Sequence, residues 1–165
     1  MLKPAIAYKE QLLDKFKYEI YSENYTLYVG YPYSNDLPNL DAFENIFRYA
    51  IVNDKDEVIG YLAYRYEPLG DCCCAFGLYS FVPREHGITS DSLILGRDVR
   101  NKLEELVENH HRVEWRVLSN NTVKKSYDWF CKKHNGHFVD LHDVTKDSKG
   151  NYVDNRIYEI INPNH

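Results

Sequence analysis

The chain has 165 residues and a mass of 19.5 kDa, which is the size of one domain. Hydrophobic residues make up 44% of it, enough to form a buried core. The formal net charge of −5 argues against nucleic-acid binding, because that affinity comes largely from Lys and Arg side chains that neutralise phosphates. The sequence has no apolar run of about 18 residues that could span a membrane, and its start lacks the apolar stretch of a signal peptide. We therefore expect a cytoplasmic protein that binds neither nucleic acid nor membranes.

The first third of the chain is predicted to contain two helices. Apolar residues recur at helical spacing over residues 8–22. The tyrosine-rich stretch 25–33 is predicted to be irregular. A second helix is expected to start near residues 36–38, where a proline stands two residues after an aspartate. Its apolar residues at i, i+3 and i+7 are Leu40, Phe43 and Phe47.

Three strands are predicted next. Residues 48–53 and 57–66 are apolar and aromatic runs joined by the polar stretch 53–56, which indicates a β-hairpin. A second turn, with Pro68 and Gly70, leads into a strand over residues 72–82. The three strands are therefore expected to pair consecutively and antiparallel.

A strand–helix–strand unit follows, and it sets the fold class. A long amphipathic helix is predicted over residues 91–109 and a strand over 112–118. So short a crossover implies a parallel strand pair. A helix that carries Tyr127 comes next, and residues 136–144 and 156–161 form a last hairpin. The prediction is an α/β (α+β) fold with a mixed sheet, in a single domain over residues 1–165.

The four cysteines predict neither disulfides nor a metal site. Cys72, Cys73 and Cys74 are adjacent, and neighbours in a strand point to opposite faces. Cys131 is followed by three histidines, but their spacing does not match a structural zinc site. We expect ordinary strand residues in a reducing compartment. The histidines are His134, His137 and His142.

The turn between strand 72–82 and the next helix can bind phosphate. The first turn of a helix has backbone N–H groups without intrahelical partners, and these groups bind anions. Gly87 lets the backbone approach a ligand closely, and Arg84 could add positive charge. Asp91 would compete with a phosphate, and it could instead be the helix N-cap. The N–H groups concerned belong to His86, Gly87, Ile88 and Thr89.

This order of elements resembles the GNAT superfamily of N-acetyltransferases, which use acetyl-coenzyme A. In that family, the loop before the helix follows an Arg/Gln-x-x-Gly-x-Gly/Ala pattern. Here the loop is degenerate, because His86 and Thr89 stand where the family has other residues. The later landmark fits better, since Asn120, Val123 and Tyr127 match the family's spacing. The resemblance implies a GNAT-like, mostly antiparallel sheet of about six to seven strands with helices on both faces.

The resemblance also implies roles for individual residues. Tyr127 would donate a proton to the leaving thiolate, and Asn120 would hydrogen-bond the pantetheine arm. The base is open among Glu114, Glu67, Asp71 and a water chain, and we select Glu114. Backbone amides near residues 79–81 would stabilise the oxyanion. The coenzyme-binding residues implied by the resemblance are Tyr79, Ser80, Phe81, Val82, Arg84, His86, Gly87, Ile88, Thr89 and Asn120.

The implied reaction moves an acetyl group from acetyl-coenzyme A to a primary amine by direct attack, without a metal. The acceptor would be a small molecule or a peptide amine, and a homodimer is the default assembly. The degenerate loop leaves one alternative open. The chain could be a non-catalytic GNAT-fold binding or interaction module whose coenzyme site has decayed.

Overall fold

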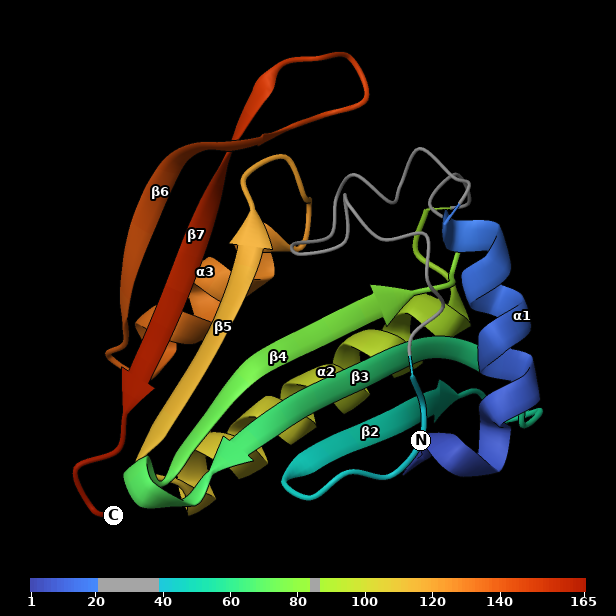
Figure 1. Cartoon of the computed structure of the whole chain (residues 1–165), viewed down its shortest axis with the longest axis horizontal. Coiled ribbons are helices and arrows are strands. Elements are labelled where there is room, and N and C mark those ends of the chain that lie inside the picture. The colour runs from blue at the N-terminus through green and yellow to red at the C-terminus, as the bar shows by residue number, and fades with distance from the viewer. Residues whose placement is uncertain (21–38, 84–86) are drawn as a thin grey trace.

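The computed structural model describes residues 1–20, 39–83 and 87–165, and these residues form one seven-stranded mixed sheet (Figure 1). The strands lie in the order β1-β2-β3-β4-β5-β7-β6, and every neighbouring pair is antiparallel except β4 and β5. In chain order the elements are β1 (Leu2–Pro4), the 3-10 helix η1 (Ala5–Tyr8), α1 (Lys9–Ile20), β2 (Ile46–Val52), β3 (Val58–Glu67), η3 (Pro68–Gly70), β4 (Cys72–Ser80), α2 (Ser90–Asn109), β5 (Arg112–Leu118), α3 (Lys124–Lys133), β6 (His137–Lys146) and β7 (Tyr152–Ile161). The predicted fold class is confirmed.

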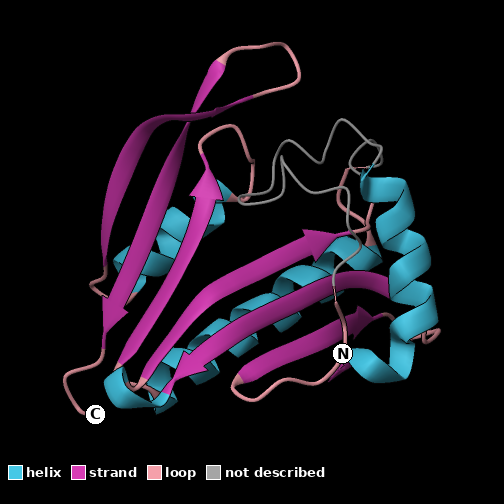
Figure 2. Ribbon diagram, in the orientation of Figure 1, coloured by secondary structure: helices cyan, strands magenta, loops and turns pink. Residues whose placement is uncertain are grey.

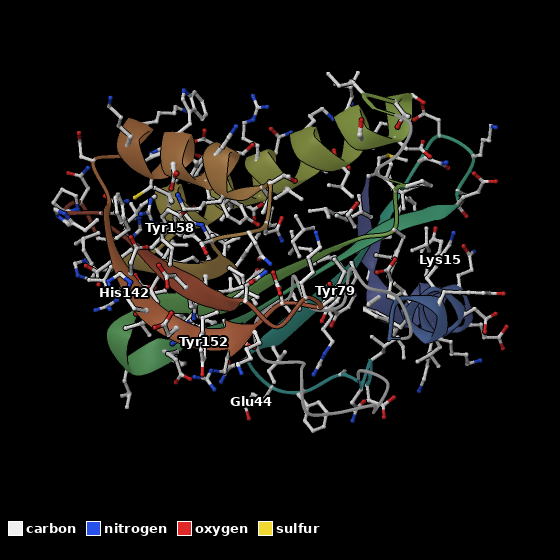
Figure 3. All side chains as sticks on the ribbon, turned by 90° about the horizontal axis from the view of Figure 1, so that it is seen from above. Lys15, Glu44, Tyr79, His142, Tyr152 and Tyr158 are labelled. Carbon is white, nitrogen blue, oxygen red and sulfur yellow. The ribbon has the colours of Figure 1, made fainter. Side chains whose placement is uncertain are left out.

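Helices cover both faces of the sheet, as Figures 1 and 2 show. Helices α2 and α3 pack on one face, where Leu103 and Trp115 belong to the larger core cluster. Helix α1 covers the other face only over β2, β3 and β4, and Phe16 packs there against Tyr61 and Tyr79. Figure 3 shows the two sides, with Tyr158 toward α3 and Tyr79 toward α1. No helix of the described residues lies over the second face of β5, β7 and β6.

A β-bulge in β4 shapes the centre of the sheet. Ala75 has a φ of 52°, and one extra residue of β4 lies opposite both β3 and β5 at this point. The bulge shifts the alternation of side chains, so that Cys73 and Leu78 both face α2. The parallel pairing of β4 with β5 runs from Cys72 to Phe76 and ends there. Beyond the bulge the two strands diverge, as Figure 1 shows.

The predicted helix over residues 36–47 is wrong in its described part, and residues 25–33 and 36–38 lie outside the described residues. Ile46 begins β2, and Phe47 pairs with Tyr64 of β3 and stacks on its ring at 4.9 Å between centroids. Phe43 makes an isolated antiparallel bridge to Ile46. Three apolar residues at helical spacing are a short pattern, and pairing with β3 outweighs it. The predicted hairpin of β2 and β3 is confirmed.

The last hairpin is longer than predicted, and its second strand, not its first, pairs with β5. β6 and β7 each have ten residues, and β7, the later strand, lies between β5 and β6. The short strand β1 at the opposite edge was not predicted, since three residues carry too little pattern. No helix within the described ranges is long and apolar enough to cross a membrane.

Candidate active site

A pocket of about 370 Å³ lies between α2 and α3, on the helix side of the opening between β4 and β5. Leu78 lines it from β4, two residues past the last registered pair with β5. Its lining is mostly apolar, with cationic side chains among the remaining residues. From the two helices the lining includes Gly96, Val99, Arg100, Lys125, Tyr127 and Trp129.

Tyr127 is held in this pocket by ring contacts. Its side chain is only 6% exposed, and its ring packs edge-on against Trp115 and Tyr158 at 6.0 and 6.1 Å between centroids. The structure thus brings Tyr127 and Leu78 into one pocket, although they are far apart in sequence. A tyrosine hydroxyl at this place can donate a hydrogen bond without carrying charge at neutral pH.

A polar network fastens α3, and therefore Tyr127, to β6 and β7. Arg156 of β7 donates to Asp128 of α3 at 3.0 Å and to both carboxylate oxygens of Asp140 at 2.6 and 2.7 Å. Tyr158 donates its hydroxyl proton to Asp128 at 2.6 Å. Burial, followed by this hydrogen bond, raises the pKa of Tyr158. The network fixes the helix on the sheet because every member has a partner.

Backbone amides of β4 alternate between the neighbouring strands. The N–H of Phe81 donates to the carbonyl of Ile59 at 3.0 Å, so Phe81 belongs to a hydrogen-bonded pair with β3. In an antiparallel ladder such pairs alternate, and the register sets Tyr79 opposite Tyr61 and Ser80 opposite Gly60. Of the three predicted oxyanion donors, only the N–H of Ser80 is thereby turned toward the β5 side. Val82 donates its N–H to the Ser80 hydroxyl at 3.3 Å.

The first turn of α2 is capped by its own side chains. Thr89 is the N-cap, its hydroxyl accepts from the N–H of Ser92 at 3.1 Å, and its own N–H donates to the Ser92 hydroxyl at 2.8 Å. The expectation that Asp91 could be the cap is wrong, because Asp91 lies inside the helix. Gly87 has a φ of 65°, which favours glycine, and Ile88 is exposed. Arg84 and His86 lie outside the described residues.

Glu114 lies on the opposite face of β5 from Trp115, and so on the other side of the sheet from Tyr127. It sits beside the bulge of β4, between the registered positions Val113 and Trp115. It accepts from Arg112 at 2.6 Å, and Arg112 also contacts Glu159 at 2.6 Å. The charge of this trio is −1, so its carboxylates are not fully neutralised.

The other two candidate bases are engaged elsewhere. Glu67 pairs with Arg65 at 2.7 Å. Asp71 contacts His110 at 2.9 Å and accepts from the N–H of His111 at 2.8 Å. The hydrogen bond with His110, followed by the one from His111, lowers the pKa of Asp71. Both residues lie before or at the start of β4, away from its diverging end.

Asn120 is exposed in the turn between β5 and α3. Its neighbour Asn121 supports that turn instead, by accepting from the N–H of Val123 at 3.1 Å. The predicted contact of Asn120 with a pantetheine arm stays a prediction.

Sequence reasoning missed the cationic and aromatic residues along the pocket. The guanidinium of Arg100 lies 6.0 Å from the ring centroid of Trp129, which is 55% exposed. Lys133 approaches the same ring at 5.8 Å. A cationic residue on the polar side of an amphipathic helix is normally a solvent-exposed residue without a function. Only the packing of α2 beside α3 shows that these side chains lie along a pocket.

The cysteines have no ligand arrangement around them. Within residues 1–20, 39–83 and 87–165, no group of three or more His, Cys, Asp or Glu side chains could hold a metal ion. Burial, the largest cause, raises the pKa of Cys72 to about 11 and of Cys73 to about 12. Both thiols are therefore poor nucleophiles at neutral pH.

The same fold occurs in solved structures of acetyltransferases. A GCN5-related N-acetyltransferase from Kribbella flavida superposes with a TM-score of 0.70, at 12% identity over 98% of this chain and 97% of that one. A GNAT-family protein from Chromobacterium violaceum gives 0.62 at 17% identity, over 98% and 85% of the two chains. A protein assigned as a phosphinothricin N-acetyltransferase gives 0.65 at 11% identity, over 98% and 97%.

No protein-family model and no curated protein sequence matches this chain. At such low identity the structural likeness establishes the fold and not the reaction. The chain has the GNAT fold, and the resemblance seen in its sequence is confirmed at that level.

Proposed function

We propose that this chain, as one domain over residues 1–165, is a cytoplasmic N-acetyltransferase that moves acetyl from acetyl-coenzyme A to a primary amine. The observation that supports this proposal is the opening between β4 and β5. On one side the opening meets the pocket with Leu78 and Tyr127, and on the other side it meets Glu114. Two substrates can then approach one point from opposite faces of the sheet.

The residues of the pocket fit a coenzyme A thioester. The pocket is largely apolar where α2 faces α3, which suits a pantetheine arm. Arg100 and Lys125 supply positive charge for phosphate groups. Gly96 leaves the surface of α2 open, since a Cβ built there meets no atom within 4 Å. The coenzyme would supply an activated acyl group, and these residues would bind and orient it.

The chain's own groups can serve each proton transfer. Glu114, or a water that it holds, would take a proton from the acceptor ammonium, because only a neutral amine attacks. The amine nitrogen then bonds to the acetyl carbon, and the N–H of Ser80 lies on the side where the oxyanion would form. When the carbon–sulfur bond breaks, the hydroxyl of Tyr127 would give its proton to the leaving thiolate. The nitrogen of the intermediate would release its second proton to water, and a proton from water would restore the Tyr127 hydroxyl.

The first experiment compares two substitutions at Gly96. Gly96→Trp fills the pocket from α2, whereas Gly96→Ala adds one methyl group in open space. We expect calorimetry to show micromolar binding of acetyl-coenzyme A to the parent chain and to Gly96→Ala. Gly96→Trp should bind at least tenfold more weakly while its thermal unfolding is unchanged. Equal affinity in all three would place the coenzyme elsewhere.

The second experiment tests Tyr127 directly. Tyr127→Phe should lower kcat about 10²- to 10⁴-fold with little change in coenzyme affinity, because it removes only the proton donor. Tyr152→Phe, at an exposed position on β7, is the matched control. Full turnover by Tyr127→Phe would contradict the assigned role. A folded parent chain that binds no coenzyme at millimolar concentration would instead support the non-catalytic module.

A further inference from the structure

The face of β5, β7 and β6 opposite α3 carries an ordered set of side chains, which we call the acceptor face. The strand registers arrange it in three rows, each with one residue from β5, one from β7 and one from β6. Adjacent rows lie about 6.6 Å apart along the strands. The rows are Glu114, Glu159 and His137, then Arg116, Ile157 and Val139, then Leu118, Asn155 and Leu141.

Arg116 stands out in the middle row because it has no partner. It is exposed, and among the arginines of the described residues it alone makes no hydrogen bond, ion pair or ring contact. It follows Trp115, the last residue of β5 registered with β4. Its guanidinium is therefore available beside the opening where the strands diverge. The partnered arginines are Arg48, Arg65, Arg97, Arg100, Arg112 and Arg156.

The row next to Arg116 carries the opposite charge. Glu114 and Glu159 share the single cation Arg112, which leaves one negative charge there. An α-amino acid spans roughly 3 Å from its nitrogen to a carboxylate oxygen. Each charge-assisted hydrogen bond adds about 2.8 Å, so such a molecule bridges side-chain tips up to about 8 Å apart. Glu114 and Arg116, two residues apart on one strand, are within that reach.

The outer part of the acceptor face is apolar. Val139 and Leu141 of β6 are 57% and 42% exposed, and Ile157 lies between Val139 and Arg116. An exposed apolar group beside a matched pair of charges suits a ligand that has an apolar side chain as well as both charges.

We propose that the acceptor is a small amine that also bears an anionic group, with an apolar α-amino acid as the class that fits. In this arrangement Arg116 binds the carboxylate, Glu114 and Glu159 hold the ammonium, and Ile157 and Val139 contact the side chain. The proposal rests on the acetyltransferase function and specifies its substrate class. It excludes polyamines, because a polycation would meet the unpaired charge of Arg116.

The test compares an acceptor that has an anionic group with one that lacks it, and adds a polycation. L-phenylalanine and L-phenylalaninamide share the amine and the ring, but the amide lacks the carboxylate; spermidine is the polycation. Thiol release from acetyl-coenzyme A should show kcat/KM about 10- to 100-fold higher for the acid than for the amide. A preference for the amide or for spermidine would overturn the proposal. So would turnover of none of the three by a chain that binds the coenzyme.

Variants of Arg116 test whether this residue causes the preference for the acid over the amide. Arg116→Gln should raise KM for L-phenylalanine about 10- to 100-fold with kcat little changed, and it should abolish the preference over the amide. Arg116→Lys should retain part of the preference, and Arg48→Gln on β2 should behave as the parent. Unchanged KM in a folded Arg116→Gln chain would refute the assignment. Calorimetry with acetyl-coenzyme A separates failure of the acceptor proposal from failure of the acetyltransferase proposal. A parent chain that does not bind the coenzyme contradicts the acetyltransferase function itself.

Discussion

Replacing Arg156 should destabilise the fold and loosen the helix that carries Tyr127. In Arg156→Leu, two carboxylates lose their shared cation, since Arg156 contacts Asp128 and Asp140 at 2.6–3.0 Å. Removing one partner of a buried ion pair costs about 3–5 kcal/mol. The Asp128 and Asp140 side chains are 34% and 32% exposed, so solvent screening reduces the expected loss to about 2–3 kcal/mol.

The loss should depend on pH in a defined direction. Hydrogen bonds from Arg156 lower the pKa of Asp140. Burial alone would raise the pKa of Asp128, but hydrogen bonds from Tyr158, Lys124 and Arg156 outweigh it and lower this pKa too. Groups with a lowered pKa stabilise the fold fully above their unfolded pKa, near 4, and lose that contribution as the pH falls. The difference between parent and variant should therefore shrink between pH 7 and pH 3.

Urea unfolding followed by circular dichroism measures this difference across the pH range. The triple variant Arg156→Leu with Asp128→Asn and Asp140→Asn is the control, because it removes the charges that the single variant leaves unpaired. It should recover part of the lost stability at pH 7. A loss below about 0.5 kcal/mol at pH 7, or one that does not change with pH, would refute the reasoning.

Three further predictions concern local packing and reactivity. Gly136→Ala should cost about 1–3 kcal/mol in urea unfolding, because its Cβ would lie 2.7 Å from the carbonyl oxygen of Glu159; a neutral result would contradict this close contact. Thr89→Ala should cost about 1 kcal/mol and Thr89→Ser almost nothing, since both hydroxyls can cap α2; equal losses would exclude the cap. At pH 8, Cys73 should be alkylated far more slowly in the folded chain than in urea, as its raised pKa of about 12 implies, and mass spectrometry would detect any rapid labelling that contradicts this.

Local periodicity of the sequence was sufficient to predict the bounds of the central helix and strand, α2 and β5. The strand β5 begins and ends as predicted, and α2 begins one residue early, because alternation and helical spacing are properties of neighbouring residues. The parallel pairing of β4 and β5 also followed from the sequence, since a short strand–helix–strand unit connects parallel strands. The GNAT fold was therefore recognisable before any contact was known.

Features of the fold that depend on distant strand partners were not predictable in the same way. Phe47 joins β2 because Tyr64 of β3 pairs with it, and this partner is distant in the chain. The extra residue at Ala75 changes which side chains of β4 face the pocket, yet alanine gives no signal for a φ of 52°. The strand β7 comes last in the chain, yet it lies between β5 and β6 and pairs with both.

The sequence by itself determined the order of the elements from β3 onward, and its resemblance to the family named Tyr127 and Glu114 as candidates. The tertiary structure decided that these two lie on opposite faces of one opening, and that Arg100 lines the pocket. It also decided that Arg116 stays without a partner while its neighbour Arg112 is shared by two carboxylates. The reason is physical: propensity and periodicity act between adjacent residues, whereas a pocket or an unpaired charge depends on which distant segments the sheet brings together.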